Sequence, residues 1–557
     1  MHRPLTRTPA PSLDFSRPGT PAARDFGDIY FSTDGGLAET RAVFLEGCGL
    51  PDGWRGRPVF TVAELGFGSG LNFLATWKAW RDSGAAGRLH YISVEGHPFE
   101  RAELARALSA FPDLADLAAP LLDSWPGPVR GVHRRHFGAV TLTLVHDDVV
   151  SALAGQDFHA DAWFLDGFSP AKNPDMWSQD VMAEVARLSA PGARLATFTV
   201  AGAVRLALGA AGFEVERKEG FGRKRHRLEA RLPGSPSRCP SVRMPTIVGA
   251  GIAGASVARA FRRRGLSPTV LSDPDHVAAS GNPAALVKPR LDLQDRSESR
   301  FFLSSFLYAR AAYRGLVLQA GVTHRPKDDT QADRLRRIAR NEPLGPGHLR
   351  WEAGALEINS AVVIDPEAVR RDFLAGCELQ ERRLFDPSEI DGPVILAAGY
   401  GIRDLWPKTA FRFSRGQLSW ADGTLERALT YGGYAIGLDG RLLLGATHDR
   451  IVDHADAFEL RPEDDARNTA QARDQGLDLG DPVTSCRASV RVNAPDTLPR
   501  LMRLESETGQ EVWILSGLGS RGFVFGPLLG EALASAYLGE PSPLETGFAE
   551  RISLCPN

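Results

Sequence analysis

Two glycine-rich turns of different spacing stand in one chain of 557 residues. The first is Gly66-Phe-Gly68-Ser-Gly70, directly after the apolar run 59–64, and the second is Gly249-Ala-Gly251-Ile-Ala-Gly254, directly after 246–248. Glycines at these spacings let the backbone turn sharply and bring its N–H groups close to a ligand at the start of a helix. The chain therefore predicts two separate nucleotide-binding α/β domains.

A proline-rich segment separates the two glycine motifs. It runs Pro233-Gly-Ser-Pro-Ser-Arg-Cys-Pro240 and is followed by Met244-Pro245. Prolines at this density cannot continue a helix or lie in a central strand. We predict a frayed or disordered lead-in over 1–27, a first domain over 28–232, a linker over 233–245, and a second domain over 246–557 with an inserted substrate subdomain.

Composition excludes several classes of protein. No stretch approaches the roughly 18 apolar residues of a membrane span, and no apolar signal region opens the chain. The five cysteines are scattered without a C-x-x-C pair, which favours a reducing cytoplasm over disulfides or a zinc site. The formal net charge is −3, so nucleic-acid binding would need a local basic face. We expect a cytoplasmic monomer without a metal or a membrane anchor.

The first half alternates β-branched runs with helical patterns, which indicates a parallel sheet. The runs are 59–64, 89–95, 162–166 and 194–199. Glu64 precedes the first glycine turn, and Glu95 ends the next run 25 residues after Gly70. A carboxylate at that place can accept both ribose hydroxyls of an adenosine. The glycines alone also fit a tight structural turn, but with both acids the pattern favours S-adenosylmethionine (SAM), since the spacing is not G-x-G-x-x-G.

Asp166 lies at the carboxyl end of the run 162–166, where ligands bind in a doubly wound sheet. There it is placed to accept a proton from an amine that attacks a methyl group, or to orient its lone pair. The alternative is a capping aspartate in a proline-rich turn, with Phe168 and Trp177 as core aromatic residues. The pattern alone leaves both interpretations open.

The second half opens with a dinucleotide fingerprint. Gly249, Gly251 and Gly254 precede a predicted helix over 255–264, and strand 269–271 is followed by two candidates for the ribose carboxylate, Asp273 and Asp275. Three later segments favour flavin over NAD: 394–399 and 415–417, which resemble segments of flavoproteins, and 515–523. The last one enters a predicted helix over 527–536, whose N-terminus is suited to stabilise negative charge on a reduced flavin.

Long motif strings in the first half resemble the bifunctional tRNA 5-methylaminomethyl-2-thiouridine biosynthesis (MnmC) family. They are Asp28-x-Tyr30-Phe31-Ser32, Gly36-Leu37-x-Glu39, Val43-Phe44-Leu45-x-Gly47, Gly66 to Phe73, Asp161 to Phe168, Pro170 to Trp177 and Gly220 to Arg225. The resemblance implies a Rossmann-like class I SAM methyltransferase that acts on the exocyclic amine of a modified wobble uridine. It gives Asp166 the acid/base or positioning role.

The second half resembles the same family and, more distantly, glycine and sarcosine oxidases. Ala279-Ser280-Gly281-Asn282 with Lys288-Pro289 looks like the loop over the flavin pyrophosphate, and Arg415-Gly-Gln417 resembles a strand start of D-amino-acid-oxidase-like enzymes. The resemblance implies an FAD-binding α+β domain in which Arg491 and Arg521 match the arginines that pair with a substrate carboxylate. Planar guanidinium groups suit that task. A surface or structural role for either arginine is the alternative.

These observations define the candidate site residues. The catalytic candidates are Asp166, Arg491 and Arg521. The expected SAM contacts are Glu64, Gly66, Gly68, Gly70 and Glu95. The expected FAD contacts are Gly249, Gly251, Gly254, Asp273, Ser280, Asn282, Gly399, Gly517, Gly519 and Gly522.

The resemblance implies one substrate for both halves, the wobble uridine of a tRNA anticodon. The FAD domain would remove the carboxymethyl group of 5-carboxymethylaminomethyl-(2-thio)uridine, and the SAM domain would then methylate the aminomethyl group, with Arg223 to Arg227 holding RNA phosphates. Two other hypotheses stay open. In one, the oxidase acts on a small amine or amino acid while the methyltransferase has a separate substrate. In the other, the flavin half is a scaffold that only docks tRNA.

Overall fold

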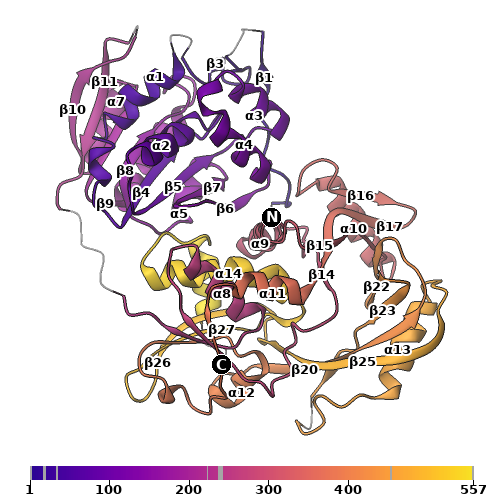
Figure 1. The fold of residues 1–557 in the computed structure, drawn as a ribbon. Helices are drawn as coiled ribbons and strands as arrows, with labels where there is room; N and C mark the ends of the chain where they lie inside the picture. The colour runs from indigo at the N-terminus through magenta and orange to yellow at the C-terminus, as the bar shows by residue number, and fades with distance from the viewer. Residues whose placement is uncertain are drawn as a thin grey trace. The chain divides into compact units, whose positions relative to one another are not determined.

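The computed structural model describes residues 3–16, 20–32, 35–222, 224–235, 242–451 and 454–554. The chain divides into two compact units (Figure 1). The first, the transferase unit, comprises Thr6–Ser241 and Gly539–Thr546, and the second, the oxidase unit, comprises Met1–Leu5, Val242–Leu538 and Gly547–Asn557. The predicted domain limits stay a prediction, and residues 236–241 of the predicted linker lie outside the described residues.

One eight-stranded sheet forms the centre of the transferase unit, in the order β10-β11-β9-β8-β4-β5-β7-β6. Its five central strands are parallel: β9 (Ser189–Thr197), β8 (Ala160–Leu165), β4 (Val59–Leu65), β5 (Arg88–Glu95) and β7 (Val140–His146). The antiparallel edges are β10 (Glu214–Glu219), β11 (His226–Arg231) and β6 (Gly131–Phe137). The four predicted runs therefore lie side by side as neighbouring parallel strands.

Helices cover both faces of this sheet because successive residues of a strand point to opposite faces. On β4, Val62 packs into the core beneath α2 (Leu71–Asp82) and α4 (Ala115–Ser124). Its neighbour Ala63 packs into the other core, beneath α5 (Val149–Ala154), α6 (Gln179–Arg187) and α7 (Gly202–Ala210). The result is a three-layered doubly wound fold (Figure 1), which confirms the predicted Rossmann-like class.

The described part of the lead-in differs from the expected disorder. It contributes β1 (Leu13–Asp14) and β2 (Ala22–Ala23), which pair with β3 (Asp28–Ile29) in a small sheet. Phe15 lies 4.1 Å beneath the guanidinium of Arg106, and Phe26 stacks on Phe168 with ring centroids 4.5 Å apart. These aromatic contacts hold the described part of the segment in a defined conformation. Its Pro- and Arg-rich composition alone had predicted a disordered segment.

The oxidase unit is built on a six-stranded sheet in the order β18-β13-β12-β19-β27-β26. The strands are β18 (Glu378–Glu381), β13 (Thr269–Ser272), β12 (Thr246–Val248), β19 (Val394–Leu396), β27 (Glu511–Ser516) and the antiparallel β26 (Arg500–Glu505). Helices α8 (Ile252–Arg262) and α14 (Gly522–Leu538) pack closely beside it, since a Cβ on Gly530 would lie 2.5 Å from Ser256 C. A buried ion pair, Arg264–Glu531 at 2.6 Å, joins α14 to the end of α8.

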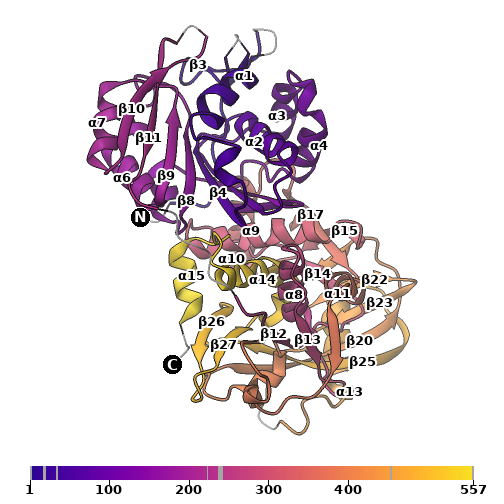
Figure 2. The same cartoon turned by 60° about the vertical axis from the view of Figure 1, so that its left-hand side comes forward.

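A second sheet of ten strands forms the inserted subdomain (Figure 2). Its strands come from two stretches of the chain, on either side of β18 and β19. They are β14 (Ala285–Val287), β15 (Val317–His324), β16 (Leu349–Glu352), β17 (Ala355–Ile364), β20 (Arg412–Asp422), β21 (Ala428–Thr430), β22 (Tyr434–Leu438), β23 (Arg441–Gly445), β24 (Asp449–Arg450) and β25 (Gly480–Asn493). The order of elements thus matches the predicted nucleotide-binding fold with an insertion. No helix among the described residues is long and apolar enough to cross a membrane.

After α14 the chain returns to the transferase unit for Gly539–Thr546. The side chain of Glu540 is 1% exposed there and pairs with Arg88 at 2.6 Å. Arg134, also buried, donates to Pro541 O at 2.6 Å, and Thr546 N donates to Gly155 O at 2.9 Å. A segment from the far end of the chain therefore supplies a buried charge to a unit that is otherwise built from the first 241 residues.

We expect Glu540→Gln to destabilise the transferase unit. The substitution leaves Arg88 without its charged partner, and because Arg88 remains partly exposed the cost should be about 2–3 kcal/mol, below that of a fully buried pair. Urea unfolding of the full-length protein, with and without SAM, would identify the transition that moves. Glu550→Gln, at an exposed glutamate, is the matched control. Equal midpoints for the two variants would contradict the structural role of Glu540.

Candidate cofactor and active sites

The first glycine turn connects β4 to α2. Gly66, Gly68 and Gly70 adopt φ angles of +85°, +52° and +73°, which other residues rarely adopt. A Cβ on Gly66 would lie 3.1 Å from the carbonyl oxygen of Asp166. The turn therefore brings the ends of β4 and β8 together, and it places three predicted SAM contacts next to the predicted catalytic aspartate.

Glu95 ends β5 and holds this turn in place. Its Oε2 accepts a hydrogen bond from Gly68 N at 2.7 Å, and its Oε1 accepts one from His97 N at 2.7 Å. Each carboxylate oxygen has a second lone pair, so both remain able to accept from ribose hydroxyls. The position of Glu95 fits the predicted contact with the adenosine moiety of SAM.

Glu64 lies deeper than the sequence suggested. Its side chain is 1% exposed, Oε2 accepts from the Ser93 hydroxyl at 2.7 Å, and Oε1 accepts from Asn72 Nδ2 at 2.9 Å. Burial raises the pKa of Glu64 to about 8. Its carboxyl oxygens thus belong to a buried hydrogen-bond network, and a direct contact with SAM stays a prediction.

Asp166 follows β8 and is joined to the same network. Its Oδ1 accepts from Gly167 N at 2.8 Å, and its Oδ2 accepts from Asn72 Nδ2 at 2.8 Å. Burial raises the pKa of this carboxyl to about 6, although both hydrogen bonds favour its charged form. Sequence reasoning missed Asn72; the available signal was a polar residue in the otherwise apolar start of α2.

Aromatic rings surround the loop after β8. Phe168 stacks on Phe26 and meets Tyr30 edge-on at 5.3 Å, whereas Trp177 is buried and donates from Nε1 to Phe168 O at 3.0 Å. Trp177 thus has the core role left open by the sequence, and Phe168 lies on the side of the small N-terminal sheet. Arg223, predicted to bind phosphate, lies outside the described residues.

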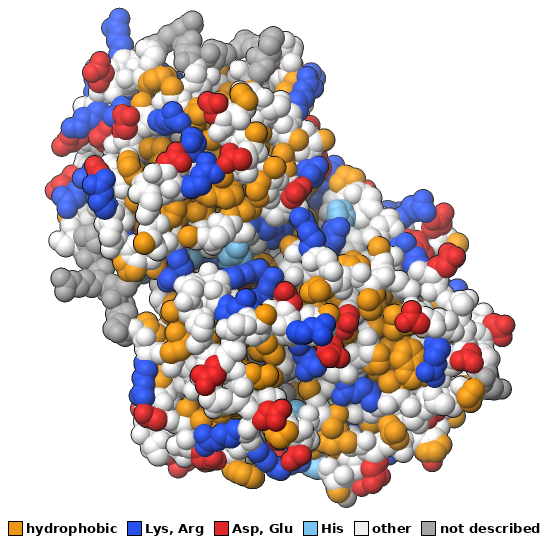
Figure 3. All heavy atoms as spheres, in the orientation of Figure 1, with side chains coloured by type: hydrophobic (Ala, Val, Ile, Leu, Met, Phe, Trp, Pro, Cys, Tyr) orange, Lys and Arg blue, Asp and Glu red, His pale blue; other side chains and the backbone are white. Residues whose placement is uncertain are grey.

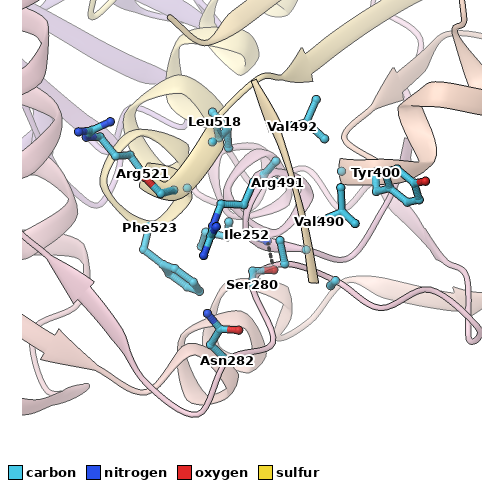
Figure 4. Close-up of a pocket in the computed structure, with 18 of the residues that line it drawn as sticks. Ile252, Ser280, Asn282, Tyr400, Val490, Arg491, Val492, Leu518, Arg521 and Phe523 are labelled. Atoms are coloured by element: carbon cyan, nitrogen blue, oxygen red, sulfur yellow. Dashed lines mark hydrogen bonds between the residues drawn. The ribbon is translucent and has the colours of Figure 1, made fainter. Parts of the chain in front are cut away.

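A cavity of about 1190 Å³ forms the centre of the oxidase unit (Figure 4). The carboxyl ends of β12, β13, β19 and β27 open into it, as expected for a ligand site in a parallel sheet. A Cβ on Gly249 would lie 2.4 Å from Ala397 O, and one on Gly254 would lie 1.8 Å from Gly249 O. Glycine is therefore required at both positions for strand, turn and helix to meet.

Most of the predicted FAD contacts line this cavity. They are Gly249, Gly251, Asp273, Ser280, Asn282, Gly399, Gly517, Gly519 and Gly522, together with the alternative Asp275. Gly254 lies behind the turn and acts through packing. Asp273 directly follows β13 and accepts from Asp275 N at 3.0 Å, which favours Asp273 for the ribose contact.

The loop around Ser280 fits a dinucleotide. Ser280 Oγ accepts from Ile252 N, the first N–H of α8, at 3.1 Å (Figure 4). Within the described part of the chain, the buried Oδ1 of Asn282 has no hydrogen-bond partner. A buried acceptor without a partner is costly, so Asn282 is suited to bind a ligand that enters the cavity.

Arg491 reaches the cavity from β25 through a gap left by a glycine. A Cβ on Gly416, on the neighbouring strand β20, would lie 2.5 Å from Arg491 Nη1. The guanidinium donates to Thr447 O at 3.3 Å and points toward Ile252 and Phe523 (Figure 4). Burial lowers the pKa of Arg491, which shows how far the cation is removed from water.

Arg521 immediately precedes α14 and, in the view of Figure 4, its guanidinium points away from that of Arg491. Arg521 acts electrostatically on Lys288: burial and the positive charge of Arg521 lower the pKa of Lys288 to about 8. Among the described residues neither side chain has an ion-pair partner. The cavity therefore holds unmatched positive charge, which suits a pyrophosphate and a carboxylate. Lys288 belongs to the segment that resembles the loop over the flavin pyrophosphate, and it lines the cavity as that resemblance implies. Sequence reasoning assigned no role to Tyr434, which also lines the cavity.

The Arg415-Gly-Gln417 motif lies inside β20 and not at its start, because Arg412–Asp422 forms one continuous strand. Arg415 is buried, pairs with Asp464, and donates to Gln417 Oε1 at 2.9 Å. Gln417 in turn accepts from Arg461 N at 2.8 Å. The motif thus anchors the inserted sheet on both sides of Gly416, the residue that makes room for Arg491.

We expect Gly254→Ala to abolish retention of the dinucleotide predicted for this cavity, because the added methyl would collide with Gly249 O and displace the turn. The visible absorbance of flavin in the purified full-length variant measures the effect. Gly547→Ala, where nothing lies within 4 Å of the added atom, is the matched control. Full flavin content in Gly254→Ala would contradict the packing argument.

Comparisons with known proteins agree with both halves of the chain. Residues 112–233 match a family described as S-adenosyl-L-methionine-dependent methyltransferase, and residues 246–536 match one described as FAD dependent oxidoreductase. The tRNA 5-methylaminomethyl-2-thiouridine biosynthesis bifunctional protein MnmC of Maricaulis maris (strain MCS10) is 42% identical, over 97% of this chain and 96% of its own length. The protein of that name from Caulobacter vibrioides is also 42% identical, over 99% and 98%.

A solved structure, the glycine oxidase from Geobacillus kaustophilus, covers 55% of this chain and 96% of its own at 16% identity, with a TM-score of 0.46. The family matches confirm SAM and FAD as the two cofactors. They also confirm a methyltransferase joined to an oxidoreductase. With end-to-end relatives at 42% identity, the chain belongs to the MnmC family of bifunctional tRNA 5-methylaminomethyl-2-thiouridine biosynthesis proteins.

Proposed function

We propose that this protein modifies the wobble uridine of tRNA in two consecutive steps. The oxidase unit removes the carboxymethyl group of 5-carboxymethylaminomethyl-(2-thio)uridine, and the transferase unit methylates the resulting aminomethyl group. The observation that carries the proposal is the end-to-end similarity to bifunctional relatives of that name, in a chain that has both cofactor folds. Cytoplasmic location and the monomeric state stay predictions.

In the first step the substrate carries a carboxylate next to an amine. Bound FAD would supply the two-electron oxidation of the carbon between these two groups, and hydrolysis of the oxidised C–N bond would release both carbons of the carboxymethyl group as glyoxylate. The residues that would hold FAD are the glycine turn, Asp273, Ser280 and Asn282. Arg491 and Arg521 would bind the carboxylate, an assignment supported by their place as cations in the lining of one cavity. Their task is to orient the reacting carbon.

In the second step the amine must be unprotonated to attack the methyl group that SAM supplies. Asp166, beside the glycine turn, is the group that accepts the ammonium proton or holds the amine in position. With a pKa of about 6 it is ionised at neutral pH, yet it is basic enough to take up a proton. Glu95 would hold the ribose of SAM.

The RNA itself would bind through local basic groups. The net charge is −3, and on the face shown in Figure 3 Lys and Arg side chains are interspersed with Asp and Glu. Arg225 is exposed near the transferase site, whereas Lys224 pairs with Glu39 at 3.0 Å and Arg227 pairs with Glu229 at 2.7 Å. An unpaired anticodon base is accessible to a pocket without opening of a duplex.

Nucleoside mass spectrometry of carboxymethylaminomethyl-bearing tRNA tests the proposal. Incubated without SAM, the full-length protein should remove the carboxymethyl mass; with SAM, the product should gain one methyl group. Unchanged nucleosides, with flavin bound, would overturn the tRNA assignment and favour the small-amine hypothesis. Methylation of an aminomethyl substrate, without any loss of carboxymethyl groups, would favour the scaffold hypothesis.

We expect Gly416→Ala to impair only the first step. The added methyl would displace the guanidinium of Arg491, so the KM for carboxymethylaminomethyl tRNA should rise roughly 10-fold, a loss of about 1.4 kcal/mol of binding. Arg491→Lys, which keeps the charge but loses the planar fork, should act in the same direction. Methylation of aminomethyl tRNA by the same variants is the internal control. An unchanged KM in both variants would exclude Arg491 from substrate binding.

A further inference from the structure

We propose that Asn72 is a positioning residue for methyl transfer, which fixes the Asp166 carboxylate by hydrogen-bonding it and the buried Glu64 carboxyl with one amide group. The inference deepens the proposed function and rests on it, because it assigns a role relative to Asp166. The motif string Gly66 to Phe73 contains this asparagine, but the resemblance gave it no role. Its place is defined by its contacts.

The side-chain amide of Asn72 uses all of its main hydrogen-bonding groups. Nδ2 carries two hydrogens; one is directed to Glu64 Oε1 at 2.9 Å and the other to Asp166 Oδ2 at 2.8 Å. Oδ1 accepts from the Thr40 hydroxyl at 2.8 Å. The opposite amide orientation would direct the carbonyl oxygen of Asn72 at two carboxyl groups, so the network itself defines the orientation.

The backbone of Asn72 is equally constrained. Gly70, in the left-handed conformation, starts α2, and Asn72 is the second residue of that helix. Its neighbours Leu71 and Phe73 are buried in the hydrophobic core, and the Thr76 hydroxyl donates to Asn72 O at 2.7 Å. Asn72 itself is 6% exposed. Helix packing thus holds the amide at one place between β4 and β8.

Asp166 needs such an anchor because it stands at the end of a strand, in a turn before a proline-rich loop. One oxygen bonds to Gly167 N and the other to Asn72. The bond to Asn72 fixes the torsion of the carboxylate, and therefore the direction in which its remaining lone pairs point. A base that is held in one orientation loses less entropy when it engages the amine.

Several charged groups surround this carboxylate. Lys224 lowers the pKa of Asp166 and Glu39 raises it, whereas Glu64 and Tyr91 are neighbours whose own pKa values the charge of Asp166 raises. Burial raises the pKa of Glu64 to about 8, so near neutral pH its carboxyl is largely uncharged and repels Asp166 little. The bond from Asn72 lowers the pKa of Asp166 against the effect of burial.

The consequence of losing Asn72 has a definite sign. Asp166 acts as a carboxylate, so methyl transfer should decline as the pH falls through its pKa of about 6. Without the amide hydrogen bond the charged form loses a stabilising contact, and the pKa rises further. The acid limb of the rate profile should therefore move to higher pH. A purely structural asparagine would change the rate without moving this limb.

The test uses the full-length protein, aminomethyl-uridine tRNA and SAM, with kcat and KM measured from about pH 5 to 9. For Asn72→Ala we expect the acid limb to move up by about one pH unit, and kcat at neutral pH to fall on the order of 10-fold, with a nearly unchanged KM for SAM. Asn72→Ser, which retains a short donor, should shift the limb less. Ser189→Ala removes another buried hydroxyl of the transferase unit, one that donates to Val185 O at 2.6 Å and has no contact with the Asn72 network, and should leave the profile unmoved.

Two outcomes would overturn the inference: an unmoved acid limb in both Asn72 variants, or an equal shift in Ser189→Ala. Calorimetric binding of SAM to each variant shows whether the transferase unit is folded, and Asn72→Ser serves if Asn72→Ala fails this check. Asp166→Asn separates this result from the proposed function. If that variant methylates like the wild type, or if the wild type does not methylate, the proposed function fails. If it is inactive while the Asn72 profiles stay unmoved, only the role of Asn72 is refuted.

Discussion

The close approach of one backbone segment to another at the glycine turns is the constraint on which both sites depend. In the transferase unit, Gly66 lies against the carbonyl of Asp166, so the SAM turn and the candidate base are parts of one contact. In the oxidase unit, Gly249 lies against Ala397 O, and Gly254 lies against Gly249 O. A single methyl group at any of these places would separate a turn from a neighbouring strand or helix. Cofactor binding and sheet packing are therefore inseparable in this protein.

The two sites differ in how they treat charge. In the transferase unit, the Asn72 amide donates hydrogen bonds to the carboxyl groups of Asp166 and Glu64. Burial raises the pKa of Glu64 to about 8, so Glu64 is largely uncharged near neutral pH. In the oxidase cavity, burial and Arg521 lower the pKa of Lys288, and burial and Arg290 lower the pKa of Arg521. No carboxylate of the described chain pairs with Lys288 or Arg521. An arrangement of buried cations gains stability only when an anion enters. The first site is thus suited to a cationic amine, and the second to an anionic substrate and cofactor.

Sequence reasoning located the two nucleotide folds because their signals are local. A strand, a glycine turn and a helix follow one another within about 20 residues. The predicted runs lie in parallel strands of the two sheets, whereas the parallel strands β7 and β18 were not predicted. The contacts that define each site were harder to predict, because they join residues far apart in the sequence. Asn72 and Asp166 are 94 residues apart. Gly416 and Arg491 lie on the neighbouring strands β20 and β25, and the missing side chain of the glycine leaves space for the guanidinium group. The return of Gly539–Thr546 to the transferase unit was also missed, because burial of Glu540 depends on Arg88, 452 residues away.

On the proposed function, the charges of the two sites also determine the order of the steps. The substrate of the first step carries a carboxylate, which the cations of the oxidase cavity attract and which Asp166 and Glu39 would repel. Once the carboxymethyl group has left, the remaining aminomethyl group is a simple cation. It then no longer matches Arg491, but it matches Asp166. The electrostatic change that weakens binding of the product in the oxidase cavity is therefore the one that makes it a substrate for methylation. Methylation before oxidation is disfavoured in the transferase unit, because Asp166 and Glu39 repel the carboxylate.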